Sequence, residues 1–138
     1  MNALLAALNT KLTDSALYND ASGRVYLDQA DSPDYPRVVY SIVSAVPDRT
    51  FDAKYQEILI QFSLFSAKSS GMSIMTTMYN DLIALLDEQN LDISGDTFVA
   101  MQEENLVTMM ETLTTPLPDG SNGVVVWHVD FSVTIKKA

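Results

Sequence analysis

The sequence feature that most constrains the fold is a long β-branched run between a proline and a charged loop, "YPRVVYSIVSAVPDRTF" at residues 35–51. From Arg37 to Val46, apolar side chains fall on both faces of a strand, because valine, isoleucine and tyrosine occupy neighbouring positions. A strand that is apolar on both faces is central in its sheet, or one of its faces is covered by another molecule. The run therefore predicts a long strand that is packed on both faces, by its own sheet or by another molecule.

A second strand follows the connection "PDRTFDAK", and its inner face carries Ile58, Ile60, Phe62 and Leu64. Two long strands joined by a charged loop form an extended hairpin. Its tip carries both signs of charge side by side, which suits a surface that contacts a second copy of itself. We expect this tip to be a subunit interface formed by Asp48, Arg49, Phe51, Asp52, Lys54 and Tyr55.

The remaining elements follow from periodicity. Leucines at helical spacing predict a helix over residues 2–13, and "TDSALYNDASG" after it has turn and loop composition. A short strand is expected at "RVYLDQ", residues 24–29. A second helix within residues 69–90 has one stripe of residues expected to be buried: Met72, Met75, Tyr79, Leu82 and Leu86.

Two further strands complete the predicted sheet. Residues 97–113 are predicted to form a strand broken by a polar kink at Gln102 to Asn105, and "TPLPDGSNG" is predicted to be a turn. Residues 124–137 alternate regularly, so Trp127, Val129, Phe131, Val133 and Ile135 share the inner face. The grouped strands predict an α+β fold. We expect a single domain, 1–138, with a mainly antiparallel sheet of four to five strands, two helices packed on one face and a long extended β-hairpin.

Composition excludes several classes of function. The 18 Asp and Glu against 8 Lys and Arg give a formal net charge of −10, which opposes tight binding to phosphate backbones or anionic membranes. The chain has no cysteine, so it forms no disulfide and carries no thiolate nucleophile. No apolar run is long enough to span a bilayer, and the N-terminal segment lacks the basic start of a signal peptide. These features favour a protein made in a cytoplasm.

Reactive constellations are also missing from the sequence. His128 is the only histidine, and although Asp130 lies on the same face of the strand, a polar outer face explains the pair without catalysis. Glu103 and Glu104 are adjacent on a strand and face opposite ways. The acidic region from Asp14 to Asp34 lacks the spacing of an EF-hand, and no nucleotide-binding or hydrolase motif occurs. We expect no enzyme activity, no catalytic residue, no metal site and no cofactor.

Several segments together resemble the tail-completion or tail-terminator proteins of long-tailed bacteriophages: "LLAALNTKL", "GRVYLDQ", "YPRVVYSIVS", "ILIQFSLFS", "MTTMYNDLIALLD" and "VWHVDFSVTI". The resemblance covers nearly the whole chain and rests on the order of elements and on two patches, "YPRVVYSIVS" and "IQFSLFS". The sequence departs from the family in two places: the glycine-rich turn after the first helix is reduced to "DASGR", and "TPLPDGSNG" is an insertion.

The resemblance implies a virion protein that forms a ring, typically of six subunits, at the head-proximal end of the tail tube. Such a ring ends tube polymerisation and gives the head connector a docking surface. The implied partners are other copies of the chain, the tail tube protein and a head-connector or neck protein, with assembly in the host cytoplasm and no membrane. DNA would pass through the lumen without specific binding, which the charge of −10 suits.

Three alternatives remain open at the level of sequence. The chain is a neck protein that joins head and tail, a tail tube protein of the same phage, or an acidic binding module that mimics the charge of DNA.

Overall fold

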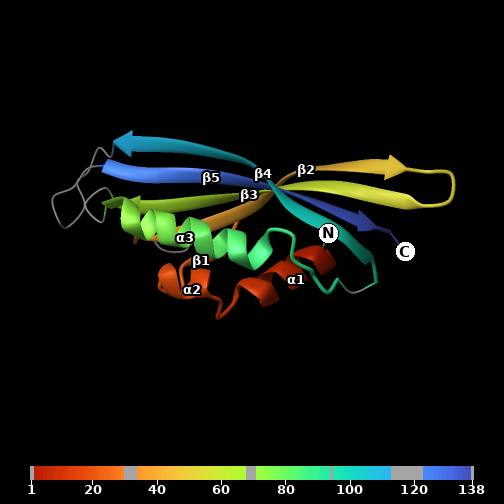
Figure 1. The fold of residues 1–138 in the computed structure, drawn as a ribbon, viewed down its shortest axis with the longest axis horizontal. Coiled ribbons are helices and arrows are strands. Elements are labelled where there is room, and N and C mark those ends of the chain that lie inside the picture. Colours follow the sequence, from red (N-terminus) through yellow and green to blue (C-terminus); the bar gives the residue numbers. More distant parts are fainter. Residues whose placement is uncertain (1, 30–33, 68–70, 94, 113–122, 138) are drawn as a thin grey trace.

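The computed structural model describes residues 2–29, 34–67, 71–93, 95–112 and 123–137. Within them the chain forms an α+β fold with three helices and a five-stranded mixed sheet (Figure 1). The helices are α1 (Asn2–Leu12), α2 (Ala16–Asp20) and α3 (Gly71–Leu86). The strands are β1 (Val25–Leu27), β2 (Arg37–Arg49), β3 (Lys54–Ala67), β4 (Thr97–Thr112) and β5 (Gly123–Lys136). The predicted fold class is confirmed.

The strand order in the sheet is β1-β2-β3-β5-β4. β1 pairs with β2 in parallel, and every other neighbouring pair is antiparallel. β1 covers β2 only from Val38 to Tyr40, so β2 is an edge strand from Ser41 to Arg49. β4 forms the opposite edge along its full length.

The helices lie on one face of the sheet and bury the core against it (Figure 1). Phe62 of β3 is central to this core: it stacks on Tyr40 with ring centroids 5.4 Å apart and meets Phe131 edge to face at 5.6 Å. Inner-face residues alternate along β3 and β5 as predicted, and Trp127 is half-buried against the ring of Tyr79. The buried residues of α1 and α3 are Leu4, Leu8, Leu12, Met75, Met78, Leu82 and Leu86.

Two details of the helical layer differ from the prediction. The segment expected to be turn and loop contains α2, whose first turn is capped by Ser15: the Tyr18 amide donates to the Ser15 hydroxyl oxygen at 3.2 Å. Five residues are too few to show a helical period, so periodicity missed this helix. Met72 was expected to be buried but is 53% exposed, because it lies in the first turn of α3, at the end of the helix.

β2 and β3 are longer than expected, β4 is more continuous, and β1 is shorter than the six residues predicted. β2 and β3 extend into the segment predicted to connect them, so only residues 50–53 remain in the hairpin loop. The kink predicted at Gln102 to Asn105 is a β-bulge at Glu104, and β4 passes through it without a break. A second bulge lies between Phe98 and Ala100. The predicted "TPLPDGSNG" turn lies almost wholly outside the described residues.

Candidate assembly surfaces

The hairpin tip brings together all six residues expected at an interface. The turn is closed by the Thr50 amide, which donates to the Ala53 carbonyl at 2.9 Å. This pairing leaves Phe51 fully exposed next to Asp52, in the loop that joins β2 and β3. Figure 1 shows this loop at one end of the molecule. The other four residues form two cross-strand pairs below the turn: Asp48 with Tyr55, and Arg49 with Lys54. Tyr55 is half-buried, and the other five are exposed.

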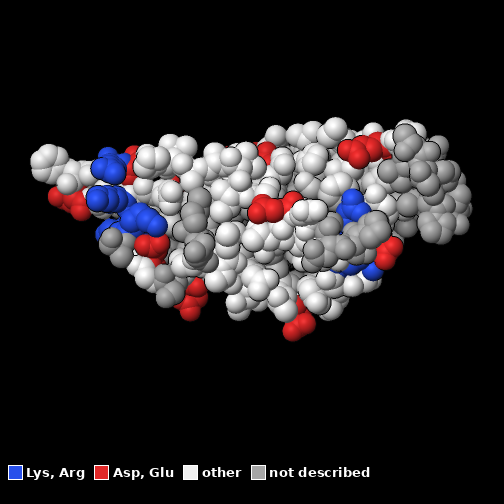
Figure 2. Space-filling view, turned by 180° about the vertical axis from the view of Figure 1, so that it is seen from behind, with Lys and Arg blue, Asp and Glu red and all other residues white. Residues whose placement is uncertain are grey.

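Positive charge gathers at this end of a strongly acidic chain, as the blue side chains at the hairpin end in Figure 2 show. Arg49 and Lys54 lie directly opposite each other, and like charges in that position destabilise a strand pair. Lys136 lies opposite Tyr55 on the neighbouring strand and is also exposed. Lys137, by contrast, is paired with Asp96 at 3.2 Å. An acidic surface placed against the hairpin would relieve the repulsion between Arg49 and Lys54.

The second surface is the free edge of β4, which the sequence analysis identified as a strand but not as an edge. Seven of the nine exposed large apolar side chains in the described residues lie on this edge or on the hairpin: Val43, Val46, Phe51, Val99, Val107, Met109 and Met110. β4 also carries three glutamates and no lysine or arginine. The signal available in the sequence was the segment from Leu106 to Met110, which is apolar except at Thr108 and places apolar side chains on both faces of the strand.

His128 lies on the polar face of the sheet, opposite the helices, and its polar neighbours there account for its position. Its Nδ1 lies 2.8 Å from the hydroxyl oxygen of Ser63, while Asp130 Oδ1 accepts a hydrogen bond from Gln61 Nε2 at 3.2 Å. Asp130 is therefore engaged with Gln61. The arrangement is two cross-strand polar pairs, Ser63 with His128 and Gln61 with Asp130, on neighbouring rungs of the β3–β5 ladder.

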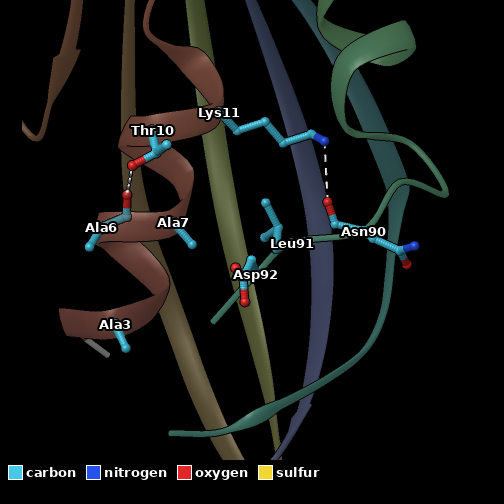
Figure 3. Close-up of a pocket in the computed structure, with 8 residues that line it drawn as sticks. All are labelled: Ala3, Ala6, Ala7, Thr10, Lys11, Asn90, Leu91 and Asp92. Atoms are coloured by element: carbon cyan, nitrogen blue, oxygen red, sulfur yellow. Dashed lines mark hydrogen bonds between the residues drawn. The ribbon is translucent and has the colours of Figure 1, made fainter. Parts of the chain in front are cut away.

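A cavity of about 510 Å³ lies between α1 and residues 90–92 (Figure 3). Its α1 wall consists of Ala3, Ala6, Ala7, Thr10 and Lys11. Lys11 Nζ donates to the Asn90 carbonyl at 3.2 Å, and the Thr10 hydroxyl donates to the Ala6 carbonyl at 3.0 Å. The polar groups of this wall are thus occupied within the chain, and the cavity carries no nucleophile and base in contact.

Two ionisable side chains in the helical layer have raised pKa values. The pKa of Asp20 is raised to about 6, mainly by burial and further by a hydrogen bond with Asp81 and the charge of Asp81. The pKa of Tyr79 is raised to about 12, mainly by burial. Smaller contributions come from the hydrogen bond to Glu103, from the negative charge of Glu103 and from the charge of Asp87. The Tyr79 hydroxyl donates to Glu103 Oε1 at 2.7 Å, which ties α3 to β4. Both shifts arise from packing between elements.

Among the described residues, no group of three or more histidine, cysteine, aspartate or glutamate side chains is placed to hold a metal ion. None of the described helices is both long enough and apolar enough to cross a membrane.

Comparison with known proteins gives a match in structure alone. No protein-family model matches the chain, and no curated protein matches it. Among solved structures, the fold is similar to a chain from the virion of a native gene transfer agent particle, with a TM-score of 0.73 and 13% sequence identity. The match covers 98% of this chain and 96% of that chain. At this identity the match establishes a shared fold across the whole chain.

Proposed function

We propose that this protein is a structural virion protein that forms a ring of six subunits, the number typical of the tail-terminator family that its sequence resembles, at the head-proximal end of a phage tail tube. The observation that carries the proposal is the fold shared, over nearly the full length of both chains, with a component of a gene transfer agent virion. In this role the ring ends tube polymerisation and provides the docking surface for the head connector. In this proposal the protein forms the wall of the ring, and its function involves no catalytic step, metal or cofactor.

Two exposed surfaces of unlike composition support self-assembly. The hairpin tip, Asp48 to Tyr55, lies at one edge of the sheet, and the acidic and apolar edge of β4 lies at the other. Contacts between unlike surfaces are heterologous, and they produce a closed ring when the rotation between copies closes. The hairpin is therefore proposed as one side of the subunit contact, through Asp48, Arg49, Phe51, Asp52, Lys54 and Tyr55.

The charge of the chain suits the lumen of such a ring. A net charge of −10 per subunit repels the phosphate backbone, so a duplex passes through without adhering. The partners in this proposal are further copies of the chain, the tail tube protein and a head-connector or neck protein. The site of function is the virion tail, after assembly in the host cytoplasm.

The test is a phage that lacks the gene for this protein. It should accumulate filled heads beside unattached tails of irregular or excessive length, and the wild-type protein should correct both defects in electron micrographs. Tails of normal length that fail to join heads would move the protein to the neck-joining role. Loss of tubes altogether would indicate a tube protein, and normal tails already attached to heads would refute all three roles.

A further inference from the structure

We propose that β4 is the receiving edge of the subunit contact: the open part of β2, Ser41 to Arg49, pairs antiparallel with the β4 edge of the next copy. This inference rests on the proposed ring and adds its second surface and its register. It starts from the topology, since β2 and β4 are the two long open edges of one sheet. Each presents backbone N–H and C=O groups that no other strand within the described residues pairs.

The direction of pairing follows from the strand order. β2, β3, β5 and β4 alternate in direction, so β2 and β4 run antiparallel within one chain. Rotation about an axis roughly along the strands preserves those directions, so β2 of one copy meets β4 of the next as an antiparallel pair. A closed ring of such copies would have a continuous sheet as its wall.

The register follows from β1, which already occupies the edge of β2 at Val38 to Tyr40. The strand pairings across β3 and β5 show which residues of the two edges lie at the same height in the sheet. Val46 lies level with Ala100 of the same chain, and β1 lies level with Leu106 to Thr108. Without displacement, β1 of one copy would therefore stand against the middle of β4 of the next. A displacement of about six residues along the strands, the kind of stagger that closing a sheet requires, moves β1 to the end of β4, with Leu27 level with Thr112.

Side-chain chemistry favours the same displacement. It places Val46 opposite Val107, and both side chains lie on the face of the sheet away from the helices. These two valines are 55% and 44% exposed in the single chain, and the contact would bury them. Ser44 then lies opposite Met109, and the exposed Val43 lies near Met110. The most apolar part of each edge thus meets its counterpart.

The charges agree with this register as well. The displaced register places Arg49 opposite the bulge at Glu103 and Glu104, with the Arg49 and Glu103 side chains on the same face of the sheet. A carboxylate there offsets the repulsion between Arg49 and Lys54 that the single chain retains. Pro47, which has no N–H, is tolerated because it interrupts the new ladder at one position only.

Cysteine cross-linking tests the register directly, because the natural chain contains no cysteine. The variant Val46→Cys with Val107→Cys should form a ladder of disulfide-linked multimers on mild oxidation, which reduction reverses. Within one chain the two positions are separated by three strand spacings, about 14 Å across the sheet, and by about six residues along the strands, so they are too far apart for a disulfide. Every disulfide between positions 46 and 107 therefore joins two copies.

The matched control is Val46→Cys with Ala100→Cys, which corresponds to pairing without displacement. The three positions that the two variants change, 46, 100 and 107, are all exposed, so the reduced proteins should keep the thermal midpoint of the parent. Cross-linking of 46 with 107, mapped by mass spectrometry and at least about tenfold faster than 46 with 100, supports the register. Equal rates, preference for the control, or no cross-linking at all would overturn it.

The outcomes separate this inference from the proposed function. Multimers in light scattering without 46–107 cross-links refute the β4 contact and leave the tail role intact. Cross-linked rings together with normal, head-attached tails in the phage lacking the gene refute the tail role and leave the contact intact. A chain that stays monomeric at every concentration and forms no cross-links refutes the contact.

Discussion

At the scale of single residues, the core is organised by aromatic rings that the sequence places on alternate positions. Phe131 is fully buried and meets Phe62 edge to face at 5.6 Å. Phe131→Ala should lower the free energy of unfolding by about 3 to 5 kcal/mol, because it removes apolar contacts and leaves a cavity. Urea denaturation measures the change. The control is Ser132→Ala, which changes the next residue, on the opposite face, and should be nearly neutral. A urea midpoint of Phe131→Ala close to that of the parent would contradict this assignment of the inner face.

The carboxyl pair between α2 and α3 gives a second residue-scale prediction. Because the pKa of Asp20 in the folded protein is about 6, above its ordinary value of 3.8, the folded state binds this proton more tightly than the unfolded state. The associated stability is fully present below pH 3.8 and is lost as pH rises through about 6. Asp20→Asn should therefore raise the thermal midpoint at pH 7.5 by about 2 to 4 °C and change it little at pH 4.

Thermal scans of Asp20→Asn at the two pH values check the sign. Asp92→Asn removes the same charge from an exposed position and is the control for net charge. If both variants shift the midpoint equally at pH 7.5, the effect comes from overall charge, and the carboxyl pair contributes nothing of its own.

At the scale of elements, prediction from sequence succeeded where one face of an element is buried by its own chain. β5 alternates because one face packs under the helices, and the leucines of α1 recur at helical spacing for the same reason. It failed where structure depends on a partner element. The capping of α2 by Ser15 is a single hydrogen bond with no period, and the identity of β4 as an edge depends on which strands pair.

The two-sided apolar pattern of β2 shows the same limit. The sequence predicted a strand that is central or covered by another molecule, and β2 is central only where β1 pairs with it. Beyond Tyr40 its apolar residues Val43 and Val46 are exposed. The apolar pattern of β2 indicates that this face favours burial, but the chain itself leaves it exposed. Only the contact in the proposed assembly would bury it.

The hairpin gives the prediction at the element scale. Changing Arg49 and Lys54 together to glutamate should weaken self-association and reverse its salt dependence, because the variant hairpin would repel the glutamates of β4 and added salt would screen that repulsion. Light scattering across salt concentrations measures the effect. The charge-preserving variant Arg49→Lys with Lys54→Arg should assemble like the parent. Unchanged rings in electron micrographs of the glutamate variant would exclude the hairpin charges from the contact.

At the scale of the whole molecule, the charge distribution sets how the protein meets DNA. The chain carries an excess of ten negative charges, although basic side chains gather at the hairpin end (Figure 2). In the proposed ring the hairpin charges face β4 of the next copy, so the acidic remainder dominates the field at longer range. At 0.01 M salt that repulsion extends over roughly 30 Å, which exceeds the reach of any single basic side chain.

We therefore expect weak duplex binding even at low salt, where attraction to phosphates is largest. Fluorescence anisotropy of a short labelled duplex should give a dissociation constant weaker than about 10⁻⁴ M, at the weak end of nonspecific binding. Raising the salt should not weaken binding further, since no phosphate contacts release counterions. His128→Ala should leave both this result and the biological role unchanged, because the ring of His128 contacts Ser63. Tight binding that falls steeply with salt would mean that the hairpin charges reach the phosphates, and the hairpin would then line the lumen instead of joining neighbouring copies.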